Sequence, residues 1–263
     1  MKKTLLMVIL SLLLLAACGA LNETHSDAVE QSPLLRTQLW ERMTLAGWEK
    51  FRVVTFTYDE ANQLTEELTQ AITNDTLTLQ RRVLNNYDEN GNKIQRVLEA
   101  WAEDRWMVIR KSSYQFIARQ IAQRVDSILN SNKPTVIRTS YEYNEDDLLL
   151  TEKSQKIEEE VTNHSRVIYH YDEGGRVVRK EFPVWLDEKW EPKQLMTFEY
   201  DSNRYHRKTT RFTWREDGWV ASIKYDLEVD DEGTRLKEHW TKNGKNYMRV
   251  TYHYLPAEGY SRP

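Results

Sequence analysis

Apolar and polar residues alternate along several stretches of the chain, and each of these stretches ends at a tyrosine. One set of alternate positions carries large apolar or aromatic side chains: Val54, Phe56, Tyr58, Val167, Tyr169, Tyr171, Met196, Phe198, Tyr200, Val250, Tyr252 and Tyr254. The positions between them are polar: Thr55, Thr57, His170, Thr197, Glu199, Thr251 and His253. This period of two predicts antiparallel strands that are buried on one face and solvated on the other.

The tyrosine that ends these stretches recurs at a nearly constant spacing. It belongs to the string Tyr-x-Tyr-Asp or a variant, whose second aromatic position, or its replacement, falls at residues 58, 87, 116, 143, 171, 200, 229 and 254. Successive copies are 29, 29, 27, 28, 29, 29 and 25 residues apart. A fixed period of this length is typical of repeat architectures, so we predict eight copies of one unit of about 28 residues.

Each unit contains two turns. One follows the tyrosine, as in residues 88–92 (DENGN), where Asn-Gly is the strongest short hairpin signal. The other lies between two large apolar residues that are five positions apart, such as Trp185 and Trp190. Two aromatic residues that bracket a tight turn predict a hairpin with a cross-strand pair near its end.

These signals predict an all-β fold, an antiparallel up-and-down meander of eight two-stranded repeats. Twisted sheets of more than about 10 strands curl, split or close. Closure removes exposed edges, so a large barrel-like sheet is favoured over a long, open, curved one. The segment from Tyr114 to Leu129 is ambiguous, because its apolar spacing also suits a helix, but its place in the repeat favours a degenerate repeat.

The first residues of the chain predict its cellular location. Lys2 and Lys3 precede an apolar run from Leu5 to Leu15 that is too short to span a bilayer, and residues 15–18 read Leu-Ala-Ala-Cys. This string resembles the signal of bacterial lipoproteins. The resemblance implies cleavage before Cys18 and a diacylglyceryl group on its sulfur, and Gly19 resembles the default route to the outer membrane in Gram-negative bacteria.

The chain is therefore expected to have three parts. Residues 1–17 are a lipoprotein signal peptide, residues 18–35 a lipidated N-terminus with a flexible polar tether, and residues 36–263 a single β-repeat domain. The covalent lipid on Cys18 is the one cofactor that we predict, and it makes the membrane a partner through the anchor. The expected location is the bacterial cell envelope, as an outer-membrane lipoprotein.

Composition narrows the function classes. The 263 residues are 40% hydrophobic, 30% charged and 11% aromatic, which argues against both a helical membrane protein and a disordered chain. The net charge of −4 gives no electrostatic basis for binding nucleic acid. Cys18 is the only cysteine in the sequence, which excludes a disulfide scaffold and a cysteine-rich metal site.

The sequence predicts no catalytic residues and no metal site. The six histidines are scattered, and any choice of a carboxylate pair among 41 acidic residues would be arbitrary. Asp88, Asn90 and Asn92 have the oxygen spacing of a calcium loop, but no glutamate completes it, so turn chemistry accounts for them. We expect that the protein is not an enzyme; the alternative is an envelope hydrolase whose site is assembled from dispersed residues.

Tryptophans are the candidate ligand-binding residues. The hypothesised stacking residues form three pairs: Trp101, Trp106, Trp185, Trp190, Trp214 and Trp219. Flat aromatic faces bind sugar rings or peptide well, whereas the alternative is that these side chains clamp the hairpins and fill a core. The first interpretation predicts a lipid-anchored binding or structural-interaction module for carbohydrate or an envelope protein. An integral outer-membrane barrel is a further alternative, but charges on both faces of the returning strand, residues 176–185, argue against it.

The repeats carry two resemblances. Residues 171–177 (YDEGGRV) and 87–92 (YDENGN) look like the YD repeats of Rhs-type bacterial shell proteins and teneurins, whose strands spiral into a β-shell, although the units here are longer. The whole chain also resembles small lipoproteins of Bacteroidetes-type bacteria, some of which are described as porin-like barrels of unknown function. The second resemblance implies a porin-like β-barrel, and neither implies a catalytic residue.

Overall fold

The computed structural model describes residues 34–129 and 134–255. Contacts between residues divide the chain into Met1–Ser32 and Pro33–Pro263, and every described residue belongs to the second unit. Cys18, the predicted signal peptide and residues 18–33 of the predicted tether lie outside the described residues. No helix in the described part of the chain is long and apolar enough to cross a membrane.

The described residues form sixteen strands. They are β1 (Leu35–Thr44), β2 (Gly47–Tyr58), β3 (Leu64–Thr73), β4 (Thr76–Tyr87), β5 (Lys93–Ala102), β6 (Arg105–Ile117), β7 (Gln120–Ile128), β8 (Thr135–Tyr143), β9 (Leu149–Ile157), β10 (Val161–Tyr171), β11 (Val177–Leu186), β12 (Lys189–Tyr200), β13 (His206–Arg215), β14 (Gly218–Val229), β15 (Arg235–Lys242) and β16 (Lys245–Tyr254).

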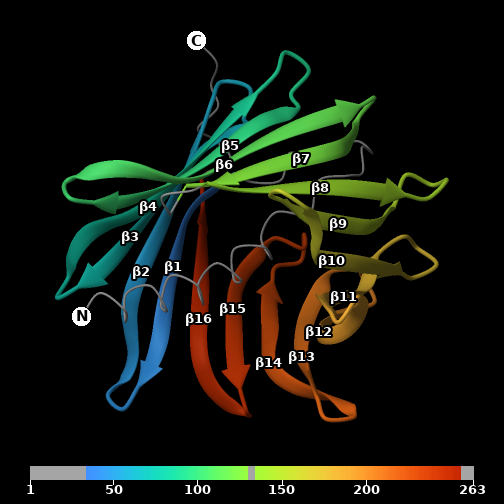
Figure 1. Ribbon diagram of the computed structural model, residues 1–263. Helices are drawn as coiled ribbons and strands as arrows, with labels where there is room; N and C mark the ends of the chain where they lie inside the picture. Colours follow the sequence, from blue (N-terminus) through green and yellow to red (C-terminus); the bar gives the residue numbers. More distant parts are fainter. Residues whose placement is uncertain (1–33, 130–133, 256–263) are drawn as a thin grey trace. The chain divides into compact units, whose positions relative to one another are not determined.

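The strands close into one antiparallel barrel in which each strand pairs with its neighbours in the sequence (Figure 1). β1 closes the barrel by pairing with β16, where Trp40 lies opposite Val250. The prediction of an all-β up-and-down meander is confirmed, and the sheet is closed rather than open. Within residues 34–129 and 134–255 there is no helix.

The ambiguous segment 114–129 forms strands. β6 runs to Ile117, a tight turn with Ala118 at a φ of 55° reverses the chain, and β7 begins at Gln120. The degenerate-repeat prediction is confirmed here, and the helix alternative is wrong. In β11 the register with β12 shifts around Pro183, which has no N–H group to donate to a ladder.

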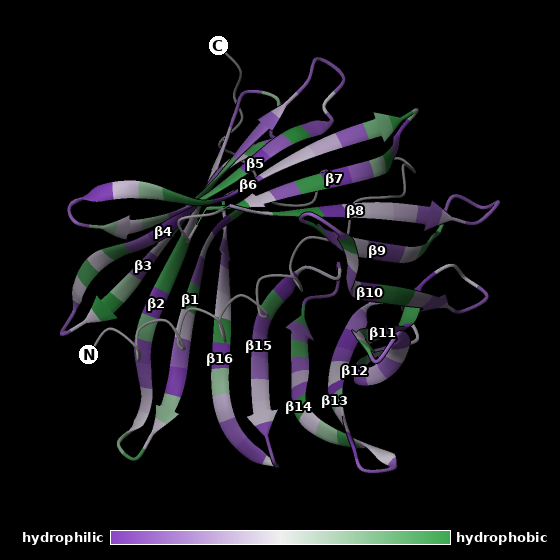
Figure 2. Cartoon of the chain, viewed as in Figure 1, coloured by the Kyte–Doolittle hydropathy of each residue, from purple (hydrophilic) through white to green (hydrophobic). Residues whose placement is uncertain are grey.

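One face of the sheet contains the core. Residues directly opposite each other on paired strands share a face, and one such row runs through Phe56, Glu67, Val83, Leu98 and Arg110. The buried hydrophobic residues on this face are Val54, Val83, Leu98, Ile137, Tyr169, Met196, Tyr225, Leu227, Trp240, Met248 and Val250. This is the inner face of the barrel, and the apolar positions of the alternating pattern lie on it. Figure 2 shows hydrophilic and hydrophobic residues alternating along the strands.

The outer face carries charge along the middle of the strands. Exposed charged residues there include Lys111, Arg138, Lys224 and Asp226, and Glu142 and Glu228 are exposed on the same face near strand ends. Cross-strand ion pairs on this face join Arg82 to Glu99, Arg249 to Glu41, Lys208 to Glu199 at 2.9 Å and Lys237 to Glu228 at 3.5 Å. The outer surface at mid-height is therefore polar and ionic.

The end of the barrel where even-numbered strands lead into odd-numbered ones is built from the Tyr-Asp motif, and we call it the Tyr-Asp rim. The side chain that opens each of six loops accepts hydrogen bonds from backbone N–H groups within the loop: Asp59, Asp88, Asn144, Asp172, Asp201 and Asp230. The hydroxyls of six repeat tyrosines donate to backbone carbonyls of neighbouring strands: Tyr58, Tyr87, Tyr143, Tyr171, Tyr200 and Tyr254. The most regular motif of the sequence therefore caps turns and strand ends, which accounts for Asp88, Asn90 and Asn92 without a calcium ion.

The opposite end consists of the connections from odd-numbered to even-numbered strands, and we call it the tight-turn rim. Four turns there hold two consecutive residues at positive φ: Asn74-Asp75, Glu103-Asp104, Asp187-Glu188 and Asn243-Gly244. Two positive φ values define the type I′ turns that match the twist of a hairpin. Exposed large hydrophobic residues gather at this rim: Met43, Leu45, Leu77, Met107, Val108, Val161, Leu186, Val220 and Tyr247.

Candidate functional site

The predicted tryptophan pairs lie at the tight-turn rim, each across one hairpin. Directly opposed residues are Trp101 and Trp106, Trp185 and Trp190, and Trp214 and Trp219. All six side chains are half-buried. Residues two positions apart on a strand share a face. Trp101 is two positions from the outer-face residue Glu99, and Trp214 is two positions from the outer-face residue Phe212, so the pairs lie on the outer face.

A β-bulge turns the second tryptophan of each pair, Trp106, Trp190 or Trp219, outward to meet its partner. Strict alternation would place Trp219, six residues before the buried Tyr225, on the inner face. The register between β13 and β14 shifts at Ser222, which has no partner on β13, and one extra residue reverses the order of faces. Similar shifts occur at Ile109 in β6 and at residues 192–193 in β12. The tryptophan pairs therefore clamp hairpins from outside and do not fill the core.

Each pair has the same geometry. The ring centroids are 5.1 Å apart for Trp101 and Trp106, with an interplanar angle of 71°. The other two pairs have centroid distances of 5.2 and 5.0 Å and angles of 68° and 76°. In such T-shaped contacts the edge of one ring meets the face of the other, a preferred aromatic arrangement that stabilises a hairpin end. Since the rings are only half-buried, part of each indole remains open to solvent.

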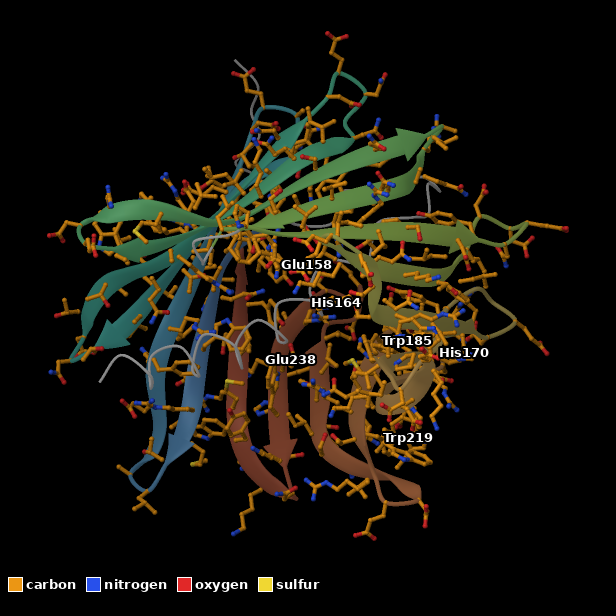
Figure 3. All side chains as sticks on the ribbon, in the orientation of Figure 1. Glu158, His164, His170, Trp185, Trp219 and Glu238 are labelled. Carbon is orange, nitrogen blue, oxygen red and sulfur yellow. The ribbon has the colours of Figure 1, made fainter. Side chains whose placement is uncertain are left out.

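Two of the three pairs come from adjacent hairpins. β12 pairs with β13, with Leu195 opposite Phe212, so the hairpins β11–β12 and β13–β14 lie next to each other. We call their tryptophans the paired-tryptophan patch: Trp185, Trp190, Trp214 and Trp219. Trp185 and Trp219 lie on the same side of the barrel in Figure 3. The turns beside the patch expose four carboxylates: Asp187, Glu188, Glu216 and Asp217.

The third pair is placed differently. Trp101 and Trp106 lie on β5 and β6, and β7 to β10 separate them from the patch. The guanidinium of Arg82 lies 4.6 Å from the ring centre of Trp106 and also forms an ion pair with Glu99. This cation–π contact covers one ring face of Trp106, so this pair offers less open aromatic surface.

An aromatic cluster that the repeat pattern does not predict lies on the inner face. The rings of Trp40 and Trp240 are 5.5 Å apart, and those of Tyr225 and Trp240 are 4.6 Å apart. Trp240 is buried, and its indole nitrogen has no hydrogen-bond partner. Trp40 and Trp240 do not belong to a close pair around a turn, so the repeat pattern gave no signal for this contact.

Carboxylates of the inner face are bound by tyrosines. Tyr252 donates to Glu238 at 2.7 Å, and Tyr169 donates to Glu152. Burial first, and the nearby carboxylate second, raise the pKa of both Tyr169 and Tyr252 above that of a free phenol. These phenols stay protonated at neutral pH, so neither is prepared as a nucleophile.

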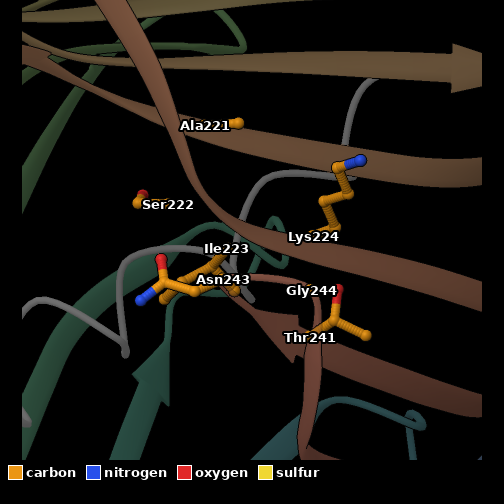
Figure 4. A pocket seen from close by; sticks show the side chains of 7 residues that line it. All are labelled: Ala221, Ser222, Ile223, Lys224, Thr241, Asn243 and Gly244. Carbon is orange, nitrogen blue, oxygen red and sulfur yellow. The ribbon is translucent and has the colours of Figure 1, made fainter.

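The described residues offer little else for chemistry. A shallow pocket with about 340 Å³ of space open to solvent lies between β14 and the turn after β15 (Figure 4). Lys224 is the one charged residue in its lining. Among the described residues, no group of three or more His, Cys, Asp or Glu side chains is arranged to hold a metal ion.

Comparisons with known proteins bear on the fold. No protein-family model matches the chain, and the search of curated proteins found no match. A porin-like protein from Bacteroides uniformis is similar to this barrel with a TM-score of 0.53 and 11% identity, over 85% of this chain and 99% of that one. The expected likeness to porin-like barrels of unknown function is confirmed at the level of the fold.

Two further similarities are too weak to support a structural argument. A porin-like protein from Bacteroides vulgatus gives a TM-score of 0.27 at 9% identity, over 85% of this chain and 99% of that one. The TcdB2-TccC3-Cdc42 structure gives 0.33 at 12% identity, over 78% of this chain and 12% of that one. The likeness to YD-repeat shells therefore stays a prediction from the sequence.

Proposed function

We propose that this protein is a lipid-anchored module of the bacterial cell envelope that binds glycan through the paired-tryptophan patch. The observation that supports the patch most is its orientation: all four tryptophans face outward and are only half-buried, and bulges in β12 and β14 turn Trp190 and Trp219 out of the core. Half-exposed indoles on two adjacent hairpins form a surface of the kind on which sugar rings stack.

The chemistry around the patch suits carbohydrate. Sugar hydroxyls need hydrogen-bond acceptors close to the stacking surface, and carboxylates are strong acceptors. Asp187, Glu188, Glu216 and Asp217 provide four exposed carboxylates in the two turns beside the patch. The same acidic turns disfavour an anionic membrane surface as the occupant, because like charges repel. The proposed ligand is therefore a neutral or cationic glycan of the envelope.

The outer face supports anchoring by lipid rather than insertion of the barrel. A charged residue on the lipid face of a membrane barrel costs roughly 2–4 kcal/mol at mid-bilayer. The middle of the outer face carries Lys111, Arg138 and Lys224 exposed, together with the ion pairs of Arg82 with Glu99 and of Arg249 with Glu41. A covalent lipid on Cys18 would hold such a barrel at the membrane without placing these charges in hydrocarbon.

The hydrolase alternative has less support. A glycosidase needs two carboxyl groups, one of them protonated, on opposite sides of a bond. The inner carboxylates Glu152 and Glu238 instead accept hydrogen bonds from buried tyrosines. The proposal is therefore that the protein binds glycan without cleaving it.

The patch is tested by glycan-array binding of the purified protein and of the variant Trp185→Ala/Trp190→Ala/Trp214→Ala/Trp219→Ala. We expect the array signal to fall by at least tenfold, because each sugar ring stacked on an indole contributes on the order of 1 kcal/mol. The variant Trp101→Ala/Trp106→Ala is the matched control, since its pair is covered by Arg82. Equal binding by the fourfold variant and the native protein, or turnover of an array glycan, would refute the proposal.

The anchor is tested separately. Cells that express the protein are fed a labelled fatty acid, and the label is expected on the native protein and not on Cys18→Ser. Membrane fractionation gives the second readout, with the native protein sedimenting with outer membranes. Label retained by Cys18→Ser would remove the lipid anchor from the proposal and leave the glycan patch standing.

A further inference from the structure

A row of arginines lines the inner face over neighbouring strands of the barrel. It consists of Arg52 on β2, Arg81 on β4, Arg96 on β5, Arg110 on β6 and Arg124 on β7. The register fixes their face: Arg110 is opposite the buried Leu98, and the others alternate in phase with inner residues. We call this row the inner arginine track. β4 to β7 are consecutive neighbours in Figure 1.

The track has more positive than negative charge. Acidic residues in phase with it are Glu67 on β3 and Asp126 on β7. Asp126 is engaged by Arg124, whose Nε lies 3.0 Å from its carboxylate. Among the ion pairs of the described residues, none includes the other four arginines. On β2 to β7, five guanidiniums thus face two carboxylates, one of them already paired, and Glu152 on β9 acts on Arg124 from the same face.

The local contacts of the track do not neutralise it. Arg52 stacks against the rings of Phe51 and Trp40, at 5.2 and 5.5 Å from their centres, and its Nε is buried with no hydrogen-bond partner. Arg81 donates from Nε to the hydroxyl of Thr69 at 3.3 Å. Cation–π and hydroxyl contacts orient a guanidinium, but they leave its full charge in place.

Each member of the track is close enough to the next to act on it. Burial, followed by the charge of Arg81, lowers the pKa of Arg52 to about 10. Burial also lowers the pKa of Arg81. Glu67 acts in the opposite direction, and the charge of Arg96 lowers the pKa further. Burial lowers the pKa of Arg110, Asp126 opposes this, and Arg124 and Arg96 lower the pKa further. Arg124 differs from the others, because its burial is outweighed by Asp126 and Glu152, which raise its pKa. Like charges held together in a partly buried row are costly unless anions lie among them.

We propose that the inner arginine track is a binding site for a polyanion that carries several phosphate or sulfate groups. The planar fork of a guanidinium binds such oxyanions with two parallel hydrogen bonds. The members are staggered along the sheet: Arg96 lies opposite Asn85, four residues from Arg81, and opposite Ser112, two residues from Arg110. Because the track extends both across and along the strands, a ligand with several oxyanions along its length suits it better than a single anion. The four unpaired arginines are half-buried, and so keep some contact with solvent.

This site is independent of the paired-tryptophan patch. The track faces the inside of the barrel on β2 to β7, whereas the patch faces outward on β11 to β14. The ligand classes also differ, because the acidic turns beside the patch would repel the anion that the track would attract. Loss of one function by mutation is therefore expected to leave the other unchanged.

The test is isothermal titration and thermal unfolding of the full chain with tripolyphosphate, at constant ionic strength set by sodium chloride. The native protein is expected to bind tripolyphosphate and to unfold at a higher temperature with it. Arg96→Gln is expected to weaken binding at least tenfold and, without the anion, to unfold at the same or a higher temperature than the native protein. Arg96→Lys, which keeps the charge but loses the fork, is expected to bind with intermediate affinity.

The matched control is a substitution of an outer-face arginine. Arg138→Gln makes the same change on the outer face of β8, where Arg138 is exposed and has no ion pair among those described, and it is expected to bind like the native protein. The proposal is overturned if tripolyphosphate does no more than sodium chloride at equal ionic strength. It is also overturned if Arg138→Gln loses as much affinity as Arg96→Lys, or if Arg96→Gln and Arg96→Lys are both destabilised without the anion.

Discussion

The two rims of the barrel use polar and aromatic residues in opposite ways. At the Tyr-Asp rim the loop-opening side chains and the repeat tyrosines bind backbone groups, as in the loop of Asn144, where Oδ1 accepts from two N–H groups at 3.0 and 2.8 Å. At the tight-turn rim, tryptophans, aliphatic side chains and carboxylates remain partly or fully exposed. The most regular part of the repeat therefore holds the fold together, and the other end is available for recognition.

The backbone differs between the rims as well. Loops of the Tyr-Asp rim put one residue at positive φ, and it is Gly91, Gly175 or Gly233 in three of them. The turn before β12 puts both Asp187 and Glu188 there, at 47° and 62°. Asn and Asp can offset the cost of a left-handed conformation with a local side-chain hydrogen bond, but glutamate cannot. This turn is therefore strained.

The largest predicted effect is at the Tyr-Asp rim. Gly233 has a φ of 84°, and a Cβ built on it would lie 2.4 Å from a ring carbon of Tyr205. We expect Gly233→Ala to lower the free energy of unfolding by about 3 kcal/mol, from overpacking and the left-handed conformation together. Urea unfolding measures this, and Gly233→Ala/Tyr205→Ala should recover the part that comes from the clash. Unchanged stability of Gly233→Ala would mean that this loop is not held as described.

Acid is expected to loosen the same rim. His206, which begins β13, lies 2.8 Å from the Thr209 hydroxyl and faces Arg235 on β15 and Lys180 on β11. Burial first, and these two cations next, lower its pKa to about 4. Because the unfolded chain binds this proton more tightly, stability is complete above about pH 6.5 and falls as the pH approaches 4, by about 3 kcal/mol.

The measurement is the free energy of unfolding of the native protein and His206→Gln between pH 4 and 7. The slope that His206 contributes should disappear in the variant. His253→Gln, which changes an exposed histidine of the outer face, should keep it. A native slope that survives in His206→Gln would assign the acid sensitivity to other groups.

A smaller effect is expected from removing one loop cap. Asn144→Ala loses two hydrogen bonds to backbone N–H groups, which should lower the free energy of unfolding by about 1–2 kcal/mol. Glu145→Ala, one residue further along the exposed loop, is the matched control and should change it little. Equal effects of the two substitutions would contradict the capping role of Asn144.

The smallest effect should have the opposite sign and lie at the other rim. Glu188→Gly places a residue without a Cβ at a left-handed position that is unfavourable for glutamate. It is expected to raise the free energy of unfolding by roughly 0.5 kcal/mol. Gly218→Ala, also at the tight-turn rim, has no atom within 4 Å of the new Cβ and should be close to neutral. Destabilisation by Glu188→Gly would show that this turn is not strained.

The fold was predictable because the same two-stranded unit, with the same strand and turn signals, occurs eight times. The period of two before each tyrosine gave the inner face, and the constant spacing gave the number of hairpins. Even residues 114–129, where apolar spacing suited a helix, followed the phase of the repeat. Cooperation between adjacent strands outweighed the local pattern there.

The orientation of the second tryptophan in each pair was not predictable. Counting alternate positions back from Tyr225 puts Trp219 inside, and only the extra residue at Ser222 turns it out. A bulge has no strong sequence signal, since Ser222 and Ile109 are ordinary strand residues, and its position depends on how two strands match in length. The inner arginine track was hidden for another reason, because its members come from β2 and β4 to β7 and only the pairing of these strands brings them to one face.

The central claim is that the Tyr-Asp rim stabilises the fold and the tight-turn rim binds ligand. Hydrogen exchange of both rims, with and without the glycan that gives the strongest array signal, tests it most directly. We expect slower exchange on ligand addition in peptides from residues 183–192 and 212–221, which contain the paired-tryptophan patch. Peptides that contain the loops after Tyr143, Tyr171 and Val229 should exchange at the same rate with and without ligand. Protection confined to those loops, or no change at the tryptophan hairpins, would contradict it.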